Sequence, residues 1–506
     1  MKNQVEIKIK DGEVWYSGII DDTINMPYTQ KTECRVNPFT DILVNQINPS
    51  LVSSLGRYLY AKDYFAYEIK NGVITVCSDG EIESGEKKDY LSALNYLKDK
   101  YFPACGKTPL KSLFKSPQYC TWMALGYNQT QDGVVGFAKS IVEAGMPSGA
   151  LIIDDGWSWY YGDWDFNKYR FPNPKKMCDE LNALGFTVAV WICPYVSPDS
   201  SSFRELDSKG LLLTKNGQPL LAKWWNGYSA CIDFTNPDGV KWFTDKIDFL
   251  VNEYGINGVK MDGGDAYIYG NGVDGFLGKN LNGVTLSNAY ARVSARYQVS
   301  ELRGAAGCAN LPVMERIADR THDWEDKNGG FDGIVKKCLV MSAFGYPFNA
   351  PDMVGGGLIG DKDGKEDEEL NIRYMQAATL MPAMQFSKTL WTYSAEMKKC
   401  VLDMLALRKK YAPLLLSELE KSGNTGEPAL KTLFYKHGVQ PENLEQFFIG
   451  DDLIVAPVLK KGQREQSVYL PDGEWMYPPT GERFTGGKTV TVSAPLEVLP
   501  YFEKGV

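Results

Sequence analysis

The chain has 506 residues, several times the usual domain size of about 100–150 residues, so we expect two to four domains or one large barrel with additions. Hydrophobic residues make up 44% and charged residues 23% of the sequence, which is typical of a globular protein and excludes a disordered or collagenous chain. The net charge of −9, without a stripe of Lys and Arg, argues against nucleic-acid binding. Only two residues are His whereas 12% are aromatic, which favours chemistry by carboxylates and offers flat apolar faces to a ligand.

The first ten residues alternate apolar and charged side chains and lack the apolar core of about 7–15 residues of a secretory signal. No run of about 18 apolar residues occurs, so we expect no membrane partner. The ten cysteines are scattered without a C-x-x-C pair, which predicts reduced thiols and a cytoplasmic protein. A homo-oligomer is compatible with the sequence.

Short alternating strands separated by turn signals fill the amino-terminal part of the chain. They are expected at residues 5–9, 13–19, 64–68 and 73–77. Asn71-Gly72, between the last two, is a typical dipeptide of a tight β-hairpin. This pattern predicts an N-terminal β-sandwich domain over residues 1–115.

Between residues 116 and 415, apolar strands alternate with helical patterns, as in βα units around a parallel sheet. Eight candidate strands fit an α/β fold, a (β/α)₈ TIM barrel. They lie at residues 119–125, 150–154, 187–192, 258–262, 304–309, 316–319, 346–349 and 382–386. Strands return after the barrel, at residues 453–459, 466–470 and 489–492, and predict a C-terminal β-sandwich domain over residues 416–506.

Acidic residues follow several of the predicted barrel strands. One strand leads into residues 154–157, Asp-Asp-Gly-Trp; another ends in Asp262, with Asp265 close behind; Asp319 and Asp352 follow later strands. Active sites of such barrels lie at the C-terminal strand ends, so these acids should meet on one face. A single strand-end acid is more often a helix cap or a turn, but clustered like charges need a ligand or a cation. Two carboxylates of different pKa are what cleavage of a glycosidic bond requires.

Lys260 precedes Asp262 by two residues and therefore shares its side of the strand. Its charge would keep Asp262 ionised, unless the pair is a structural ion pair at the sheet end. The two histidines have no suitably spaced partners, so we expect neither a metal nor another cofactor.

Several segments resemble glycoside hydrolase family 31. Residues 259–265, Val-Lys-Met-Asp-Gly-Gly-Asp, resemble its Lys-x-Asp nucleophile motif at the end of the fourth barrel strand. The family has a second acid in an Asp-Asn-x-x-x-Trp pattern, and residues 319–324 keep that spacing with Arg320 in place of Asn. The resemblance runs from about residue 119 to about residue 458 and is greatest to the branch that contains the myogenesis-regulating glycosidase. The segments that point to this branch are residues 223–227, 316–324, 345–348, 351–356 and 381–387.

The resemblance implies a retaining mechanism, in which Asp262 attacks the anomeric carbon and Asp319 acts first as general acid and then as general base. Retention places the two carboxyl groups about 5–5.5 Å apart. Asp323 is the alternative acid because it also precedes an aromatic residue in the same loop. The spacing to Trp324 and the position of Arg316 favour Asp319.

The sugar is predicted from departures from the family pattern. Family 31 α-glucosidases typically carry Asp-Ile-Asp-Tyr at the second strand and a His near the last one. This sequence has Asp-Asp-Gly-Trp at residues 154–157 and no His between Trp324 and His437. The Asp-Asp-Gly-Trp string resembles family 36 α-galactosidases, whose paired acids bind the 4- and 6-hydroxyls of galactose. We therefore expect an exo-acting α-galactosidase with a small α-galactoside as its partner.

Alternatives remain at this point. Asp154 and Asp155 could form a strand-end turn, the enzyme could be an α-glucosidase or a transglycosylase, and the fold could be a non-catalytic carbohydrate-binding protein. For stacking on the sugar we expect Trp157, Trp191 and Trp225, with Trp224 structural. The other expected substrate contacts are Asp154, Asp155, Asn226, Lys260, Asp265, Arg316 and Asp352.

Overall fold

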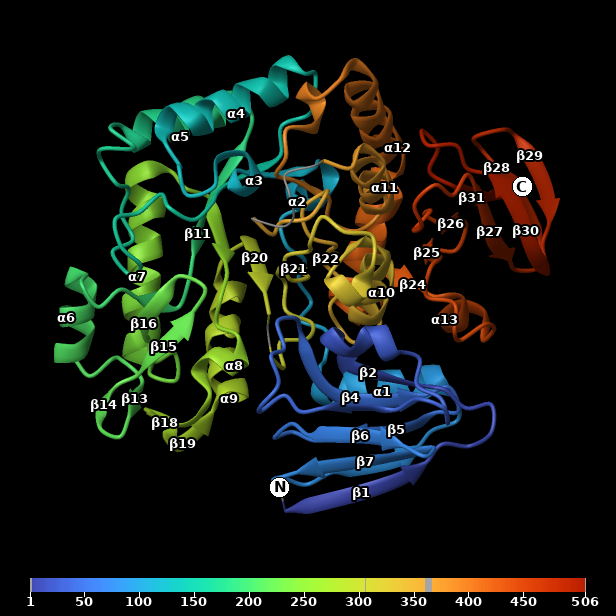
Figure 1. Cartoon of the computed structure of the whole chain (residues 1–506), viewed down its shortest axis with the longest axis horizontal. Helices are drawn as coiled ribbons and strands as arrows, with labels where there is room; N and C mark the ends of the chain where they lie inside the picture. Colours follow the sequence, from blue (N-terminus) through green and yellow to red (C-terminus); the bar gives the residue numbers. More distant parts are fainter. Residues whose placement is uncertain (1, 305, 360–365, 506) are drawn as a thin grey trace.

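The computed structural model describes residues 2–304, 306–359 and 366–505. Its elements run from a β-rich N-terminal region through a series of alternating strands and helices to a β-rich C-terminal region (Figure 1). The blue N-terminal sheets lie against one side of the central part, and the red C-terminal sheets lie beyond its last long helices. The predicted TIM barrel with β-rich flanking regions is confirmed.

Two four-stranded antiparallel sheets form most of the N-terminal region. One has the order β1 (Asn3–Lys8), β7 (Val73–Ser78), β6 (Ala66–Lys70) and β3 (Cys34–Val36). The other has the order β2 (Trp15–Ile19), β4 (Ile47–Ser53), β5 (Arg57–Tyr60) and β8 (Glu83–Glu86). The hairpin between β6 and β7 turns at Asn71 and Gly72, both with positive φ, as the sequence predicts.

Eight parallel strands form a nearly closed barrel. Their order is β22 (Asn349–Ala350), β21 (Met314–Arg316), β20 (Val299–Arg303), β17 (Gly258–Met261), β11 (Thr187–Ile192), β10 (Ala150–Ile153), β9 (Gln118–Cys120) and β23 (Gln385–Phe386). A parallel bridge between Met353 and Gln385 links the two ends of this sheet. Strands such as β10 are buried on both faces, which explains their continuous apolar runs.

Helices follow the barrel strands and cover them. They include α4 (Gln131–Glu143), α5 (Pro174–Ala183), α7 (Pro237–Tyr254), α9 (Gly283–Ala291), α10 (Ile334–Ala343), α11 (Glu368–Thr379) and α12 (Ala395–Thr425). Helix α7 shows why these segments are helical. At its start the Asn236 side chain accepts from the N–H of Asp238, and at its end Gly255 has positive φ. None of the helices in the described ranges has the length and hydropathy needed to span a membrane.

Three predicted barrel strands were wrong in position. The fifth was expected at residues 304–309 but is β20, which ends at Arg303, and Gly304 has positive φ. Small residues at 306–309 lie in a loop against the N-terminal region, where Ala306 bridges to Ile47. Residue 305 lies outside the described residues. The sixth strand is predicted at residues 316–319 but already ends at Arg316. The seventh is predicted at residues 346–349 and begins only at Asn349.

The C-terminal region has its own hydrophobic core, which includes Phe448, Trp475 and Phe502. A six-stranded sheet has the order β24 (Leu430–Lys431), β25 (Phe447–Ile449), β26 (Leu453–Val455), β31 (Tyr501–Lys504), β28 (Glu474–Tyr477) and β29 (Glu482–Thr485). β27 (Glu465–Leu470) pairs with β30 (Lys488–Ser493). The predicted boundary between residues 415 and 416 falls within α12. The domain boundaries stay predictions.

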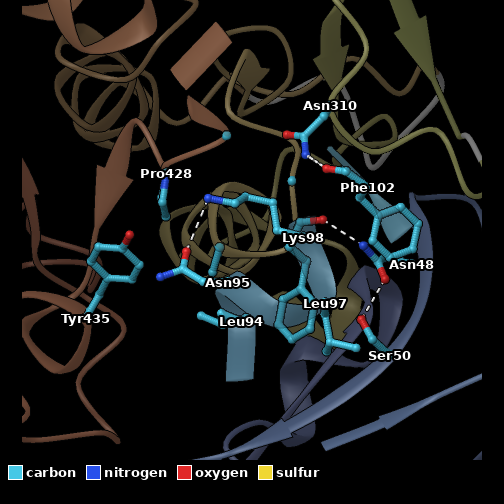
Figure 2. Close-up of a pocket in the computed structure, with 14 residues that line it drawn as sticks. Asn48, Ser50, Leu94, Asn95, Leu97, Lys98, Phe102, Asn310, Pro428 and Tyr435 are labelled. Carbon is cyan, nitrogen blue, oxygen red and sulfur yellow. Dashed lines mark hydrogen bonds between the residues drawn. The ribbon is translucent and has the colours of Figure 1, made fainter. Parts of the chain in front are cut away.

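Polar side chains join the N-terminal region to the barrel and to the end of α12 (Figure 2). The Asn48 side chain donates to the Phe344 carbonyl at 2.8 Å, and Lys98, on α1 (Tyr90–Tyr101), donates to the Thr425 carbonyl at 2.8 Å. The side chain of Asn310 donates to the Phe102 carbonyl. These contacts fix the N-terminal sheets against the barrel.

Arg408 on α12 gives a test of how the helix is held. Its buried guanidinium donates to the carbonyls of Phe114, Thr379, Met381 and Pro382. Arg408→Met would leave these carbonyls unpaired, and we expect it to cost at least ~3 kcal/mol of stability. Calorimetry should show a fall in Tm of several degrees. Lys409→Met, an exposed change on the same helix, is the control, and equal Tm values for the two variants would contradict the prediction.

Candidate active site

A cavity of about 390 Å³ opens at the C-terminal ends of the barrel strands. This is the face on which barrel enzymes place their catalytic groups. It brings together seven of the residues expected from the sequence. They are Asp154, Asp155, Trp191, Trp225, Lys260, Asp262 and Asp319.

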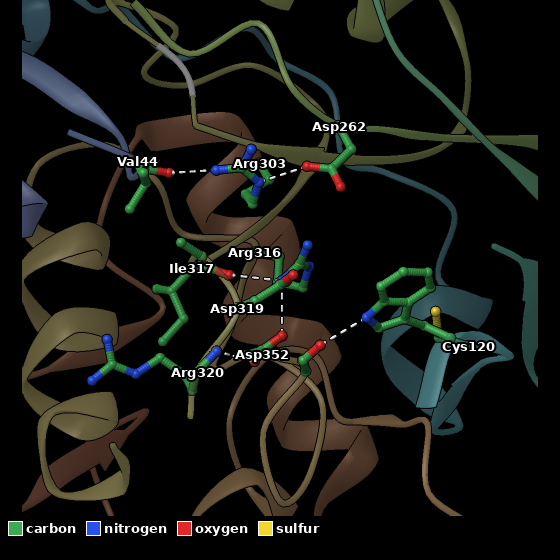
Figure 3. Close-up of polar contacts among 12 residues, drawn as sticks. Val44, Cys120, Asp262, Arg303, Arg316, Ile317, Asp319, Arg320 and Asp352 are labelled. Carbon is green, nitrogen blue, oxygen red and sulfur yellow. Dashed lines mark hydrogen bonds and ion pairs between the residues drawn. The ribbon is translucent and has the colours of Figure 1, made fainter. Parts of the chain in front are cut away.

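Asp262 follows β17 and is held on both carboxylate oxygens. Oδ1 accepts from Arg303 Nε at 2.5 Å and from the Gly263 N–H at 2.9 Å, and Oδ2 accepts from Trp191 Nε1 at 2.9 Å. Figure 3 shows Arg303 between this carboxylate and the Val44 carbonyl. Burial opposes ionisation, but the positive charges of Arg303, Arg316 and Lys260 outweigh it and hold the pKa of Asp262 well below its usual range. Asp262 is therefore a carboxylate at neutral pH.

Lys260 forms its own ion pair with Asp154. Its Nζ lies 2.7 Å from Asp154 Oδ2, and both side chains are 3% exposed. Cys120 also donates to Asp154 Oδ2, and Asp154 Oδ1 accepts from the Asp155 N–H at 2.8 Å. Lys260 thus forms a buried ion pair with Asp154, and its charge also lowers the pKa of Asp262.

Asp155 lies beside Asp154 in a network of neutral donors. Its Oδ2 accepts from Asn226 Nδ2 at 2.9 Å and from the Tyr161 hydroxyl at 3.1 Å. Asn226 in turn accepts from the Tyr127 hydroxyl at 2.8 Å. Burial, together with the negative charge of Asp154, raises the pKa of Asp155 to about 7. Asp155 can therefore donate or accept a proton near neutral pH.

Asp319 belongs to a second group of charges, centred on Arg316 (Figure 3). Arg316 is fully buried and pairs with Glu301 at 2.8 Å, with Asp352 at 2.8 Å and with Oδ1 of Asp319. The side chain of Asp319 is 31% exposed, against 11% for Asp262, so Asp319 has the greater access to solvent. Burial and the charge of Asp319 raise the pKa of Asp352 to about 7 although Arg316 opposes the shift.

Other predicted residues lie behind the side chains that line the cavity. Trp157 is fully buried against Trp164 and Phe166, and its indole N–H donates to the Trp191 carbonyl at 2.8 Å. It does not line the cavity, so the expectation that it stacks on a sugar is wrong: its faces are covered by other aromatic rings. Trp224 is buried beneath Trp225, as expected.

The remaining predicted contacts act through their neighbours. Asp265 binds the guanidinium of Arg303 with both oxygens at 2.9 Å. Asn226 holds Asp155, while Arg316 and Asp352 lie beneath Asp319. The side chains outside the cavity lining are those of Asp265, Asn226, Arg316 and Asp352. Asp323, the alternative acid, is outside it as well, and its Oδ1 accepts from the N–H of Glu325 at 3.2 Å.

Arg303 is the main residue that the sequence analysis missed. It ends β20, Val299–Arg303, whereas the sequence pattern predicts the fifth strand directly after it, at residues 304–309. The available signal is weak, because this strand mixes the apolar Val299 and Leu302 with polar and charged residues. Tyr127 and Tyr267 also line the cavity and were not predicted.

The N-terminal region supplies part of the site through residues 44–46, called here the docking segment. The Val44 carbonyl accepts from Arg303 Nη1 at 3.0 Å, and Asn45 Oδ1 accepts from the backbone N–H of Ala318 at 2.7 Å. Gln46 Nε2 donates to the Arg316 carbonyl at 3.1 Å. The docking segment thus fixes the backbone that leads to Asp319. Among the described residues, no group of His, Cys, Asp and Glu is arranged to hold a metal ion.

Comparison with known proteins identifies the family. The profile of the "Glycosyl hydrolases family 31 TIM-barrel domain" matches residues 117–418, more than half of the chain. The chain belongs to glycosyl hydrolase family 31. The profile of the family 31 C-terminal domain matches residues 426–505. The family expected from the motifs is therefore confirmed.

Family 31 relatives share both sequence and fold with the chain. It is 33% identical over 403 residues to the "Myogenesis-regulating glycosidase" of Mus musculus, covering 76% of this chain and 56% of the relative. It is 29% identical over 318 residues to the "SITS-binding protein" of Tetronarce californica, covering 59% and 45%. The chain thus spans about half the length of these curated relatives. The structure of a Flavobacterium johnsoniae family 31 dextranase with glucose superposes with a TM-score of 0.85 at 19% identity, covering 99% of this chain and 66% of that chain.

The raised pKa of Asp155 predicts a pH-dependent stability. The unfolded residue titrates near its ordinary pKa of about 3.9 and the folded one at about 7. Between these values the folded state holds a proton that the unfolded state releases, so the free energy of unfolding falls as pH rises, by up to about 1.4 kcal/mol per unit. The Asp155→Asn variant lacks this titrating group. The free energy of unfolding of the variant minus that of the original protein should therefore increase from pH 4 to pH 7.

Denaturant unfolding at several pH values measures that difference. Asp199→Asn, an exposed change in the loop before α6 (Ser201–Ser208), is the control and should show a constant offset. A constant offset for Asp155→Asn as well would contradict the assigned titration.

Proposed function

We propose that the chain is a retaining exo-acting α-glycosidase, and specifically an α-galactosidase. The observation that carries the proposal is one cavity with two carboxylates in different environments. Asp262 is paired with Arg303 and kept ionised, whereas Asp319 is more exposed. Cleavage of a glycosidic bond with retention needs one carboxylate to attack and another carboxyl group to transfer a proton.

Asp262 is the nucleophile in this proposal. Hydrogen bonds from Arg303, Gly263 and Trp191 fix the carboxylate in one orientation, and the low pKa keeps it unprotonated. Its attack on the anomeric carbon breaks the bond to the leaving oxygen and forms a glycosyl-enzyme. Because the donors are already in place, little reorganisation is needed as the charge on Asp262 changes.

Asp319 is the acid and then the base. It gives its proton to the leaving oxygen as the glycosidic bond breaks, and then takes a proton from the water that releases the sugar from Asp262. Arg316 holds Oδ1 of Asp319, and Asn45 of the docking segment holds the preceding N–H of Ala318. These contacts position the carboxyl group rather than take part in the reaction.

The galactoside assignment rests on Asp154 and Asp155. Both line the cavity, and hydrogen bonds from Lys260, Asn226 and Tyr161 fix their carboxyl oxygens, which in this proposal accept from the 4- and 6-hydroxyls of the sugar. A site built to hydrogen-bond one hydroxyl geometry rejects the epimer strongly, because its buried polar groups would be left unpaired. An α-glucosidase or transglycosylase on the same scaffold is the nearest alternative.

A binding protein without catalysis is the second candidate function. The likeness to a relative named as a SITS-binding protein favours it. The ionised Asp262 opposes it, since a ligand-binding pocket has no need for a carboxylate held by three donors.

A panel of 4-nitrophenyl α-glycosides tests the proposed function. We expect release of nitrophenol from the α-galactoside, with kcat/KM at least about a hundredfold above that for the α-glucoside, since rejection of an epimer costs unpaired buried groups. The reverse preference would replace galactose by glucose. No turnover of any glycoside, combined with measurable sugar binding, would favour the binding protein.

Two carboxamide variants test the roles of the carboxylates. Asp262→Asn removes the nucleophile and should abolish turnover of every substrate. Asp319→Asn should lower kcat by about 10²–10⁴-fold for poor leaving groups and much less for 4-nitrophenyl glycosides, which need little protonation. Asp323→Asn is the matched control and should resemble the original protein. If Asp323→Asn shows the dependence on leaving group and Asp319→Asn does not, the acid is misassigned.

A further inference from the structure

The wall of the cavity beside Asp319 is aliphatic. Leu358 and Ile359 line it and are 46% and 44% exposed. The N–H groups of Gly357 and Leu358 donate to the Arg320 carbonyl at 3.1 and 3.2 Å. The backbone that carries the aliphatic side chains is therefore fixed to the residue that follows Asp319. Exposed aliphatic side chains at the mouth of a cavity usually mark a surface that an apolar group covers.

Aromatic residues continue this aliphatic wall. Trp122 Nε1 donates to the Gly357 carbonyl at 2.8 Å, and the ring of Trp122 packs edge-on against Tyr127 at 5.1 Å between ring centroids. Ile359 approaches Gly126 so closely that its Cδ1 lies 3.7 Å from where a Cβ on Gly126 would be. The wall is thus a preformed apolar surface that joins two loops of the barrel.

The basic side chains that line the cavity are engaged in ion pairs. Lys260 binds Asp154, and Arg303 binds Asp262 and Asp265. Beside Asp319, the lining side chains outside these ion pairs are mainly hydrocarbon and ring faces. A sugar in this position would bring several hydroxyls to a wall with few partners for them, which costs free energy for each unpaired group.

Given the proposed role of Asp319, its position identifies which part of the substrate meets this wall. A general acid must reach the leaving oxygen within hydrogen-bond distance, so the group attached to that oxygen leaves the cavity past Asp319. We propose that the aglycone is an apolar alkyl or aryl group that packs on Leu358, Ile359 and Trp122. Asp319 protonates the glycosidic oxygen as the bond to the anomeric carbon breaks, and the apolar alcohol departs; water then releases the free sugar.

Homologous series of methyl, butyl and hexyl α-galactosides and α-glucosides test this inference, with galactosyl-glucose and glucosyl-glucose disaccharides for comparison. Alkyl alcohols have similar leaving-group pKa values, so a change in kcat/KM along a series reports packing. Each fully buried methylene is worth about a fourfold gain. We expect kcat/KM to rise by about tenfold or more from methyl to hexyl, and the hexyl glycoside to exceed the disaccharide of the same sugar.

A matched pair of variants locates the effect. Leu358→Ser should lower the hexyl-to-methyl ratio of kcat/KM by about threefold or more, since it removes apolar contact area. Leu55→Ser, the same change at a leucine that is 43% exposed in the N-terminal region, should leave the ratio unchanged. A ratio that both variants preserve would place the aglycone elsewhere and overturn the inference.

The two series separate this inference from the proposed function. Turnover of galactosides without a gain along the series, or with the disaccharide preferred, overturns the apolar aglycone and leaves the α-galactosidase standing. Turnover of glucosides alone with the gain overturns the sugar and supports the apolar aglycone. No turnover in either series overturns both.

Discussion

The site depends on pairing buried carboxylates with a small number of buried cations. A buried charge is tolerated only when it is paired and hydrogen-bonded, because removing it from water is costly. Lys260, Arg303 and Arg316 provide the positive charge at three neighbouring strand ends, and each binds one or more acids. Removing one partner would leave an uncompensated buried charge. The ion pairs therefore couple the strand ends to the loops that follow them and to the shape of the cavity.

The same pairing sorts otherwise similar acids into different protonation states. Asp262 faces Arg303 directly and keeps a low pKa, whereas Asp155 is surrounded by neutral donors and has a pKa of about 7. Asp352 also reaches about 7, although Arg316 touches it, because burial and the neighbouring Asp319 outweigh that contact. At neutral pH the site therefore carries less negative charge than its number of acidic residues suggests. This lower charge allows many carboxyl groups to lie on one face.

The sequence predicted the barrel because its strands are buried on both faces and read as apolar runs. It predicted that Asp262 and Asp319 lie at one end of that barrel because each follows a candidate strand, and the resemblance to family 31 supplied their expected roles. It failed at Arg303, where an apolar stretch of small residues after Gly304 looked more strand-like than the true strand. It also failed at Trp157, because position after a strand does not tell which way an aromatic ring turns. Both errors concern tertiary packing, which local patterns do not encode.

The docking segment joins parts of the chain that are far apart in the sequence. The bond from Arg303 to the Val44 carbonyl joins residues 259 positions apart, and the bond from Ala318 to Asn45 spans 273 positions. Contacts between such distant residues carry a large loop-closure cost and form slowly. During synthesis the docking segment is made long before the strands it holds, so this face of the barrel cannot be completed until more than half of the chain exists. The cavity is thus completed late in folding, when the two ends of this span meet.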